Sequence, residues 1–289
     1  MRKHIVFICI FLLSSYLLLG QDSNQPKGIE LQYLTWQEAG EAFKKHDVVV
    51  IPLGAITKEH GPHLPLNNDY LMAEYLAERV VKELNIILMP TIPFGFYPAF
   101  LEYPGSVSLE FNTFKNLVKD ICKSLDGIKK FYILNTGYST AKPLALAAKE
   151  LSEELGIEMR YTDIQKVSED ISKQVAAQKG GGHAYEIETS MMLYIKPEIV
   201  NMDKAPKDFH PKTGKGGFTR DPNKPGIYSP TGIWGDATSR KITSSYGTGS
   251  KDICRTAGLL LTGRIKDYAV MEPWGPSSVN QILTGLTLR

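Results

Sequence analysis

Short apolar runs alternate with amphipathic stretches over the first 160 residues. Four runs predict strands, at 48–53, 86–90, 130–135 and 157–161, and the first two are wholly apolar. Such runs are typical of a parallel sheet covered on both faces. Between them, apolar residues recur every three or four positions, which predicts helices at 36–45, 69–84, 111–125 and 142–155. The alternation predicts an α/β fold built from right-handed βαβ units in one mostly parallel sheet.

The rest of the chain is less regular. Residues 91–109 form a loop rich in aromatic residues, Pro and Gly. Loops of this length are usually functional, although this one could simply cover the surface. A polar helix is expected near 164–178, a helix at 184–195 after the glycines 180–182, and another at 249–264. The turn-rich segment 202–240 is expected to form either a second wall of a site or a subunit contact.

The N-terminus carries a targeting pattern. Arg2, Lys3 and His4 precede an apolar segment at 5–19. A basic start and an apolar segment of this length predict a secretory signal peptide over 1–20, with an uncleaved anchor as the alternative. Residues 21–28 read as a disordered linker and 29–289 as a single domain. Either alternative places that domain outside the cytoplasm, in the periplasm or the extracellular space.

Composition narrows the classes of function only slightly. The 289 residues are 43% apolar and 22% charged, and 33 basic residues nearly balance 31 acidic ones. A net charge of +2 gives no electrostatic footprint for nucleic acid. Cys9 falls in the predicted signal, so Cys122 and Cys254 form one disulfide or remain two buried thiols. Their spacing matches no zinc-binding cysteine cluster.

The candidate chemistry is concentrated in the loop between the first long strand and the helix at 69–84. Glu59, His60, His63 and Asp69 lie there, and the chain has only six histidines. Histidine and carboxylate side chains beyond the carboxyl end of a strand are the ligands that divalent ions need in hydrolases. There are structural alternatives, because Asp69 could cap the helix and His63 could be a core histidine.

A second group of candidates follows the glycines at 180–182. His183, Glu186 and Glu188 fall within six residues. Residues two apart on a helix do not share a face, so at most one of the two glutamates is expected to point into a site. The two loops are expected to meet over one edge of the sheet. The chain has neither a Gly-x-Ser-x-Gly elbow nor a Walker loop.

Several motifs, in order, resemble the creatininase (creatinine amidohydrolase) family. The stretch Glu59-His-Gly-Pro-His-Leu-Pro-Leu-Asn-Asn-Asp69 resembles its first signature, and His183-Ala-Tyr-Glu-Ile-Glu-Thr-Ser190 its second. The resemblance runs from Leu34 to Pro197. It implies a three-layer αβα domain, often assembled as a homo-hexamer, that holds two divalent ions, usually zinc or manganese.

The resemblance also implies roles for particular residues. His60 matches a metal ligand and Asp69 the carboxylate shared by the ions, with Glu59 as the predicted third ligand. His183 and Glu188 match acid and base groups beside the substrate, and Glu188 or Glu186 is alternatively a ligand. The residues expected to line the substrate pocket are His63, Tyr138, Phe96 and Tyr97.

The chain departs from the family pattern at two positions. Lys58 stands where the family has a glutamate two residues before the histidine. Gly137, in Asn135-Thr-Gly-Tyr-Ser-Thr140, stands where the family supplies a further histidine ligand. These departures leave the number of ions, one or two, open.

The resulting hypothesis is an exported hydrolase that cleaves a C–N bond of a small molecule of the cyclic amide type, in which metal-activated water attacks the carbonyl. One alternative is a catalytically silent relative that binds a small ligand or partner. Another is a lactone-type hydrolase with a mononuclear site. The expected partners are a small-molecule substrate and copies of the chain itself, in a homo-oligomer such as a hexamer. No nucleic acid, and no stable membrane span in the mature form, is expected.

Overall fold

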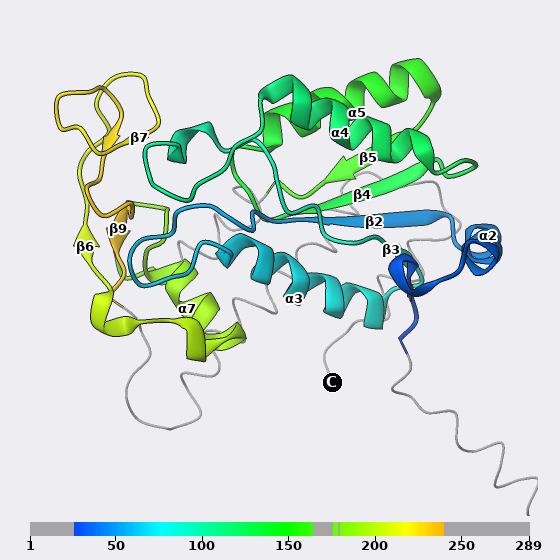
Figure 1. Ribbon diagram of the computed structural model, residues 1–289, viewed down its shortest axis with the longest axis horizontal. Coiled ribbons are helices and arrows are strands. Elements are labelled where there is room, and N and C mark those ends of the chain that lie inside the picture. The colour runs from blue at the N-terminus through cyan, green and yellow to red at the C-terminus, as the bar shows by residue number, and fades with distance from the viewer. Residues whose placement is uncertain (1–25, 164–175, 179, 240–289) are drawn as a thin grey trace, which may run out of the picture.

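The computed structural model describes residues 26–163, 176–178 and 180–239 (Figure 1). Four predictions therefore lie wholly or mostly outside the described residues. They concern the signal peptide at 1–20, the helices near 164–178 and 249–264, and the pairing of Cys254 with Cys122. Cys122 itself is fully buried in the core, and this burial raises the pKa of its thiol to about 12.

A five-stranded sheet forms the centre of the molecule, and all its pairings are parallel. Its order is β1-β3-β2-β4-β5. The strands are β1 (Ile29–Glu30), β2 (Val48–Leu53), β3 (Ile87–Leu88), β4 (Lys130–Asn135) and β5 (Glu158–Tyr161). The strand β1 was not predicted, because two residues are too short to show a pattern.

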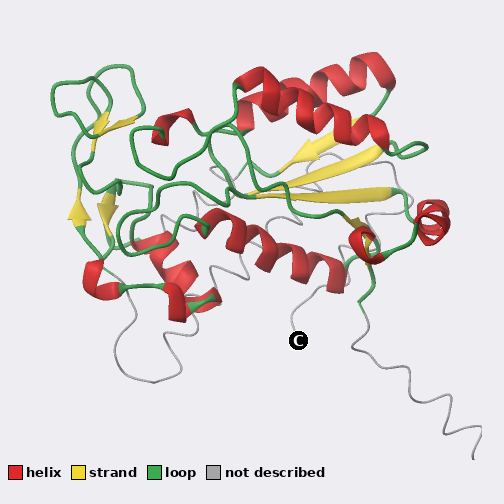
Figure 2. Ribbon diagram, viewed as in Figure 1, coloured by secondary structure: helices red, strands yellow, loops and turns green. Residues whose placement is uncertain are grey.

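Helices cover both faces of this sheet (Figure 2). They are α2 (Trp36–Lys45), α3 (Asn68–Glu83), α4 (Phe111–Ser124) and α5 (Ala141–Leu155). In Figure 1, α4 and α5 lie on one face and α3 on the other, while α2 sits at one end. The three-layer α/β fold expected from the sequence is confirmed. Thr35 is the N-cap of helix α2, and its side chain and that of Glu38 form a capping box.

The central strand β2 is buried on both sides, which explains its uninterrupted apolar sequence. Along β2, Val49 and Ile51 pack in the core with Phe114 of α4. The intervening Val50 packs in a second core with Leu76 of α3. Successive side chains of a strand point to opposite faces, so one apolar run supplies both cores.

Two sequence-based boundaries are wrong. Lys27 and Gly28, predicted to belong to a disordered linker, donate backbone hydrogen bonds to the carbonyls of Lys82 and Val81 at the end of α3. The helix predicted from Ala184 is α7 (Glu186–Ile195) and begins two residues later. It starts there because Ala184 has a left-handed φ of 49° and Tyr185 is extended.

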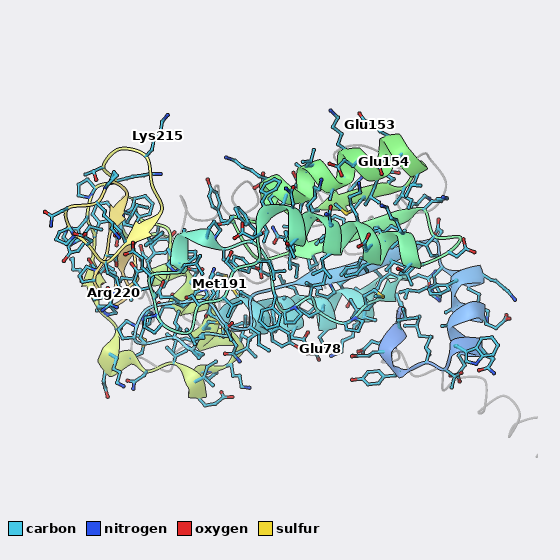
Figure 3. All side chains as sticks on the ribbon, turned by 45° about the horizontal axis from the view of Figure 1, so that its top comes forward. Glu78, Glu153, Glu154, Met191, Lys215 and Arg220 are labelled. Atoms are coloured by element: carbon cyan, nitrogen blue, oxygen red, sulfur yellow. The ribbon has the colours of Figure 1, made fainter. Side chains whose placement is uncertain are left out.

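Residues 196–239, which follow α7, lie beyond the carboxyl ends of the strands (Figure 1). They contain 3-10 turns at Pro197–Ile199 and Met202–Lys204. Two small sheets follow, built from β6 (Lys207–Asp208), β9 (Gly235–Asp236), β7 (Phe218–Thr219) and β8 (Ile227–Tyr228). Figure 3 shows Lys215, between β6 and β7, pointing away from the rest of the molecule. Within the described residues, every helix is too short or too polar to cross a membrane.

Candidate metal centre

The candidate site lies where the chain leaves β2 and β4. These strands pair in register, so Leu53 and Asn135 end side by side. The next strands after β2 lie on opposite sides of it, and ligands of α/β proteins bind at such a switch point. The Thr136 hydroxyl ties both loops to α3, because it donates to the carbonyls of Leu53 and Asp69, each at 3.0 Å.

The first loop brings three buried side chains together. The Asp69 carboxylate lies 2.8 Å from His60 Nε2 through Oδ1 and 2.5 Å from Lys58 Nζ through Oδ2. His60 and Asp69 are at most 1% exposed. Burial alone would raise the pKa of the Asp69 carboxyl, but the neighbouring Lys58 and His60 hold it well below its usual range. Asp69 is therefore an ionised group facing His60, and not the helix cap that the sequence left open.

The second loop places His183 against the first. The ring centres of His60 and His183 are 5.1 Å apart. His183 Nε2 lies 3.0 Å from Glu59 Oε2 and 3.1 Å from the Glu59 carbonyl. Its other nitrogen, Nδ1, faces Glu188 Oε2 at 3.9 Å. Glu188 is held in turn by the backbone N–H of Ala184. Ala184 is fully buried in its left-handed conformation, a kind of strain that is common at functional sites.

His60, His183 and Glu188 form a group that suits a divalent ion. One ligand atom from each lies within 4.8 Å of the others. Two imidazoles and one carboxylate are the protein ligands of many catalytic zinc sites, which leave one position open for water or substrate.

The hydrogen bonds of the two histidines fit the same role. His183 Nε2 lies beside the Glu59 carbonyl, which can only accept, so Nε2 donates to Glu59 and Nδ1 faces Glu188 with its lone pair. His60 has an acceptor beside each nitrogen, because the Lys58 carbonyl lies 2.9 Å from Nδ1 and Asp69 Oδ1 lies 2.8 Å from Nε2. When Nδ1 donates to the Lys58 carbonyl, Nε2 and Asp69 Oδ1 face each other with lone pairs, and a cation would satisfy both. Ligating histidines usually donate their other N–H to a carbonyl or carboxylate in this way.

Two further predicted site residues, His63 and Tyr97, are buried. His63 is 1% exposed, and its Nε2 lies 2.8 Å from Thr189 Oγ1. Burial, with smaller contributions from His60 and His183, lowers the pKa of His63 to about 4. Tyr97 is buried, and its hydroxyl has no hydrogen-bond partner within the described chain. Burial, followed by the charge on Asp69, raises its pKa well above the usual value.

Three predicted residues are not brought into the group. The Glu186 carboxylate accepts hydrogen bonds from the backbone N–H groups of Ala177 and Gln178. Phe96 packs edge-on against Phe111 in the core. Tyr138 is 64% exposed. At most one of Glu186 and Glu188 was expected to point into a site, and of these two Glu188 alone joins the two histidines.

The sequence did not reveal the aromatic wall around His183. Its ring centre lies 4.5 Å from that of Phe100 and 5.1 Å from that of Phe218. The backbone of Trp234 pairs with that of His183. Gly232 lies against the Glu59 carboxylate, where an added Cβ would clash. Thus the 202–240 segment forms a second wall of the site. Phe218 and Trp234 stand among turns without periodicity, and only the length of the segment hinted at a role.

Comparison with known proteins gives consistent relatives. The family model described as creatinine amidohydrolase matches residues 32–247. A 3-dehydro-scyllo-inosose hydrolase of Thermotoga maritima is 24% identical over 65% of this chain, and the match spans 64% of that protein. A creatinine amidohydrolase of Pseudomonas putida is 26% identical over 62% of the chain and 76% of its own length. A mycofactocin precursor peptide peptidase of Mycobacterium ulcerans is 25% identical over 66% of this chain and 75% of its own length.

Solved structures share the fold. A manganese form of creatininase superposes with a TM-score of 0.65, at 21% identity, over 85% of this chain and the whole of that one. A mutant creatininase of the Zn-Zn type gives a TM-score of 0.64, at 21% identity, over 85% of this chain and 99% of that one. The family model covers about three quarters of the sequence, in the order of motifs that the sequence showed. The chain belongs to the creatininase family.

Proposed function

We propose that this chain is a metal-dependent hydrolase that cleaves a C–N bond of the amide type in a small molecule. The observation that carries the proposal is the group of His60, His183 and Glu188, in which one ligand atom of each residue lies within 4.8 Å of the others. Relatives named as a creatinine amidohydrolase and as a peptide peptidase support an amide-type bond.

The residues of the chain would divide the work as follows. His60, His183 and Glu188 hold the ion, which when bound lowers the pKa of a water molecule and polarises a carbonyl. The Lys58 carbonyl orients His60, and Glu59 orients His183. The rings of Phe100 and Phe218 shield His183 from water, which strengthens electrostatic interactions at the site. This assigns to His183 and Glu188 a ligand role, while their role in proton transfer stays a prediction.

The test compares His60→Ala with His210→Ala. His210 is partly exposed and pairs with Asp208, outside the metal group, so its removal is the matched control. Purified chains are assayed against cyclic amides, short peptides and lactones. We expect amide hydrolysis to fall at least 100-fold in His60→Ala and after treatment with a chelator. It should return when zinc or manganese is added to the native chain, and His210→Ala should stay active.

Two results would overturn the proposal. Amide hydrolysis that survives complete chelation would exclude a metal-dependent mechanism. Failure to hydrolyse any compound by a chain that has bound metal would favour the silent binding relative. A third result, preferential hydrolysis of lactones, would replace the proposal by the lactone-type alternative. This alternative is worth testing because the Thermotoga maritima relative is named as a 3-dehydro-scyllo-inosose hydrolase, so similar chains are named for substrates other than creatinine.

The setting of this activity is also part of the proposal. The basic start and apolar segment of residues 1–20 lead us to infer that the enzyme meets its substrate outside the cytoplasm. Secretion of the full chain, with cleavage near residue 20, would be seen by mass spectrometry of the exported protein. The homo-oligomer expected from the family resemblance is tested by light scattering of the same sample.

A further inference from the structure

The Lys58 ammonium occupies one side of the Asp69 carboxylate. Nζ lies 2.5 Å from Oδ2, and the two side chains are 6% and 1% exposed. The other oxygen, Oδ1, faces His60. A carboxylate that bridges two metal ions through both of its oxygens needs both of them free. Here one of the two positions is already taken by a cation that belongs to the chain.

Aromatic rings enclose the same ammonium. Nζ lies 5.0 Å from the ring centre of Phe100 and 5.4 Å from that of Tyr97, within the range of cation–π attraction. These contacts stabilise a desolvated ammonium but supply no ligand for a metal. They fix Lys58 in the place beside Asp69 and keep water away from it.

Gly137 has no room for a side chain that could serve as a further ligand. A Cβ added to Gly137 would lie 2.9 Å from the Tyr97 ring and 3.0 Å from Thr140 Oγ1. Thr140 is itself fixed by Asn135, whose Oδ1 accepts from it at 2.7 Å. A side chain at position 137 would therefore require Tyr97 to move. The Tyr97 ring and the Lys58 ammonium together fill this part of the site.

We propose that the Lys58 ammonium stands in place of a second metal ion, so that the site holds one divalent ion per chain. This inference rests on the proposed metal site and deepens it. Lys58 is then a positioning residue. It keeps Asp69 ionised and fixed beside His60, while His60, His183 and Glu188 hold the ion.

The experiment counts ions in the full chain and in three variants. Lys58→Glu reverses the charge, Lys58→Met removes it at similar volume, and Lys119→Met is the matched control. Lys119 is also a buried lysine, 8% exposed, with a 2.5 Å ion pair to Glu150, but it lies between α4 and α5. Zinc and manganese are counted by elemental analysis after equilibrium dialysis, and binding is followed by calorimetry. Circular dichroism checks that each chain is folded.

We expect one ion per native chain and per Lys119→Met chain, and two per Lys58→Glu chain. Lys58→Met should bind its first ion at least tenfold more tightly, because a repelling charge has gone and Asp69 has been freed. Two ions per native chain, or one ion in folded Lys58→Glu with unchanged affinity in Lys58→Met, would overturn the inference and leave the hydrolase proposal standing. No ion in the native chain would overturn both.

Discussion

The roles of His60 and His183 are set by the atoms behind them. Each ring has one nitrogen next to a backbone carbonyl, while its other nitrogen faces a carboxylate. Glu59, predicted as a ligand, lies behind His183. A residue that supplies no ligand atom can thus keep a place in the site, because orienting a ligand is as necessary as supplying one.

His63 gives a prediction at the scale of the residue. Its pKa is lowered to about 4 from an ordinary 6.5, first by burial. The folded chain therefore binds its proton less readily than the unfolded chain, and stability is lost as pH falls from about 6.5 to about 4. The loss should be on the order of 3 kcal/mol, and it levels off below that range.

Urea unfolding of metal-free protein at several pH values measures this effect. His63→Gln, which can still bond to the Thr189 hydroxyl, should show a shallower loss of stability between pH 6.5 and 4. His210→Gln, at an exposed position, should follow the native profile. A profile for His63→Gln as steep as that of the native chain would contradict the assignment.

At the scale of elements, the approach of α3 to β2 positions Asp69. Gly54 follows β2 directly, and an added Cβ there would clash with the Asp69 carbonyl and approach Ala73 to 2.9 Å. The absence of a side chain at Gly54 therefore lets the first turn of α3 lie against the end of the strand. Periodicity predicted where the helix and the strand lie in the sequence. It did not show how closely the first turn of α3 approaches the end of β2.

Gly54→Ala should consequently destabilise the fold by about 1–3 kcal/mol, as overpacking usually does. Because the displaced backbone carries Asp69, metal affinity should fall as well. Gly40→Ala in α2 is the control, since a Cβ there meets nothing within 4 Å. It should stabilise the chain by about 0.5–1 kcal/mol through helix propensity. Denaturant unfolding of both variants measures these changes in the free energy of unfolding. An unchanged free energy of unfolding in Gly54→Ala would refute the packing argument.

At the scale of the whole molecule, the site joins parts of the chain that are far apart in sequence. His60 comes from the loop after β2, Glu188 from α7, and the wall from the segment before β9. Glu102, in the aromatic loop, ties that loop to the wall. It accepts from Thr219 at 3.0 Å and pairs with Lys224 at 3.0 Å. Hydrogen bonds to the Arg220 backbone, Lys224 and Thr219 lower the pKa of Glu102 to about 2.

A bound ion should therefore stabilise the entire fold. At a free metal concentration a hundredfold above Kd, the expected gain is about 2.7 kcal/mol, or roughly 5–10 °C in Tm for a domain of this size. Thermal melts with chelator and with added zinc or manganese measure it. His60→Ala should lose the shift and His210→Ala should keep it. An equal shift in His60→Ala would mean that the stabilising ion binds elsewhere.

The sequence by itself determined the α/β architecture, the main strands and helices, and the two loops that carry the chemistry. Apolar runs and 3.6-residue periodicity are local properties, so they can be read without knowledge of contacts. The histidines and carboxylates of both loops were also visible, because such residue types seldom gather without a reason. The family resemblance followed from the same stretches, and the residues matched by the family model agree with it.

Only the tertiary structure decided how these residues divide their roles. It set Glu188 apart from Glu186, put Glu59 behind His183, and brought Phe100 and Phe218 around the site. It also showed that Lys58, a departure from the family motif, forms an ion pair with Asp69. The direction of a side chain and its charged neighbours depend on how distant segments pack. Packing is a property of the whole chain, and no local pattern in the sequence records it.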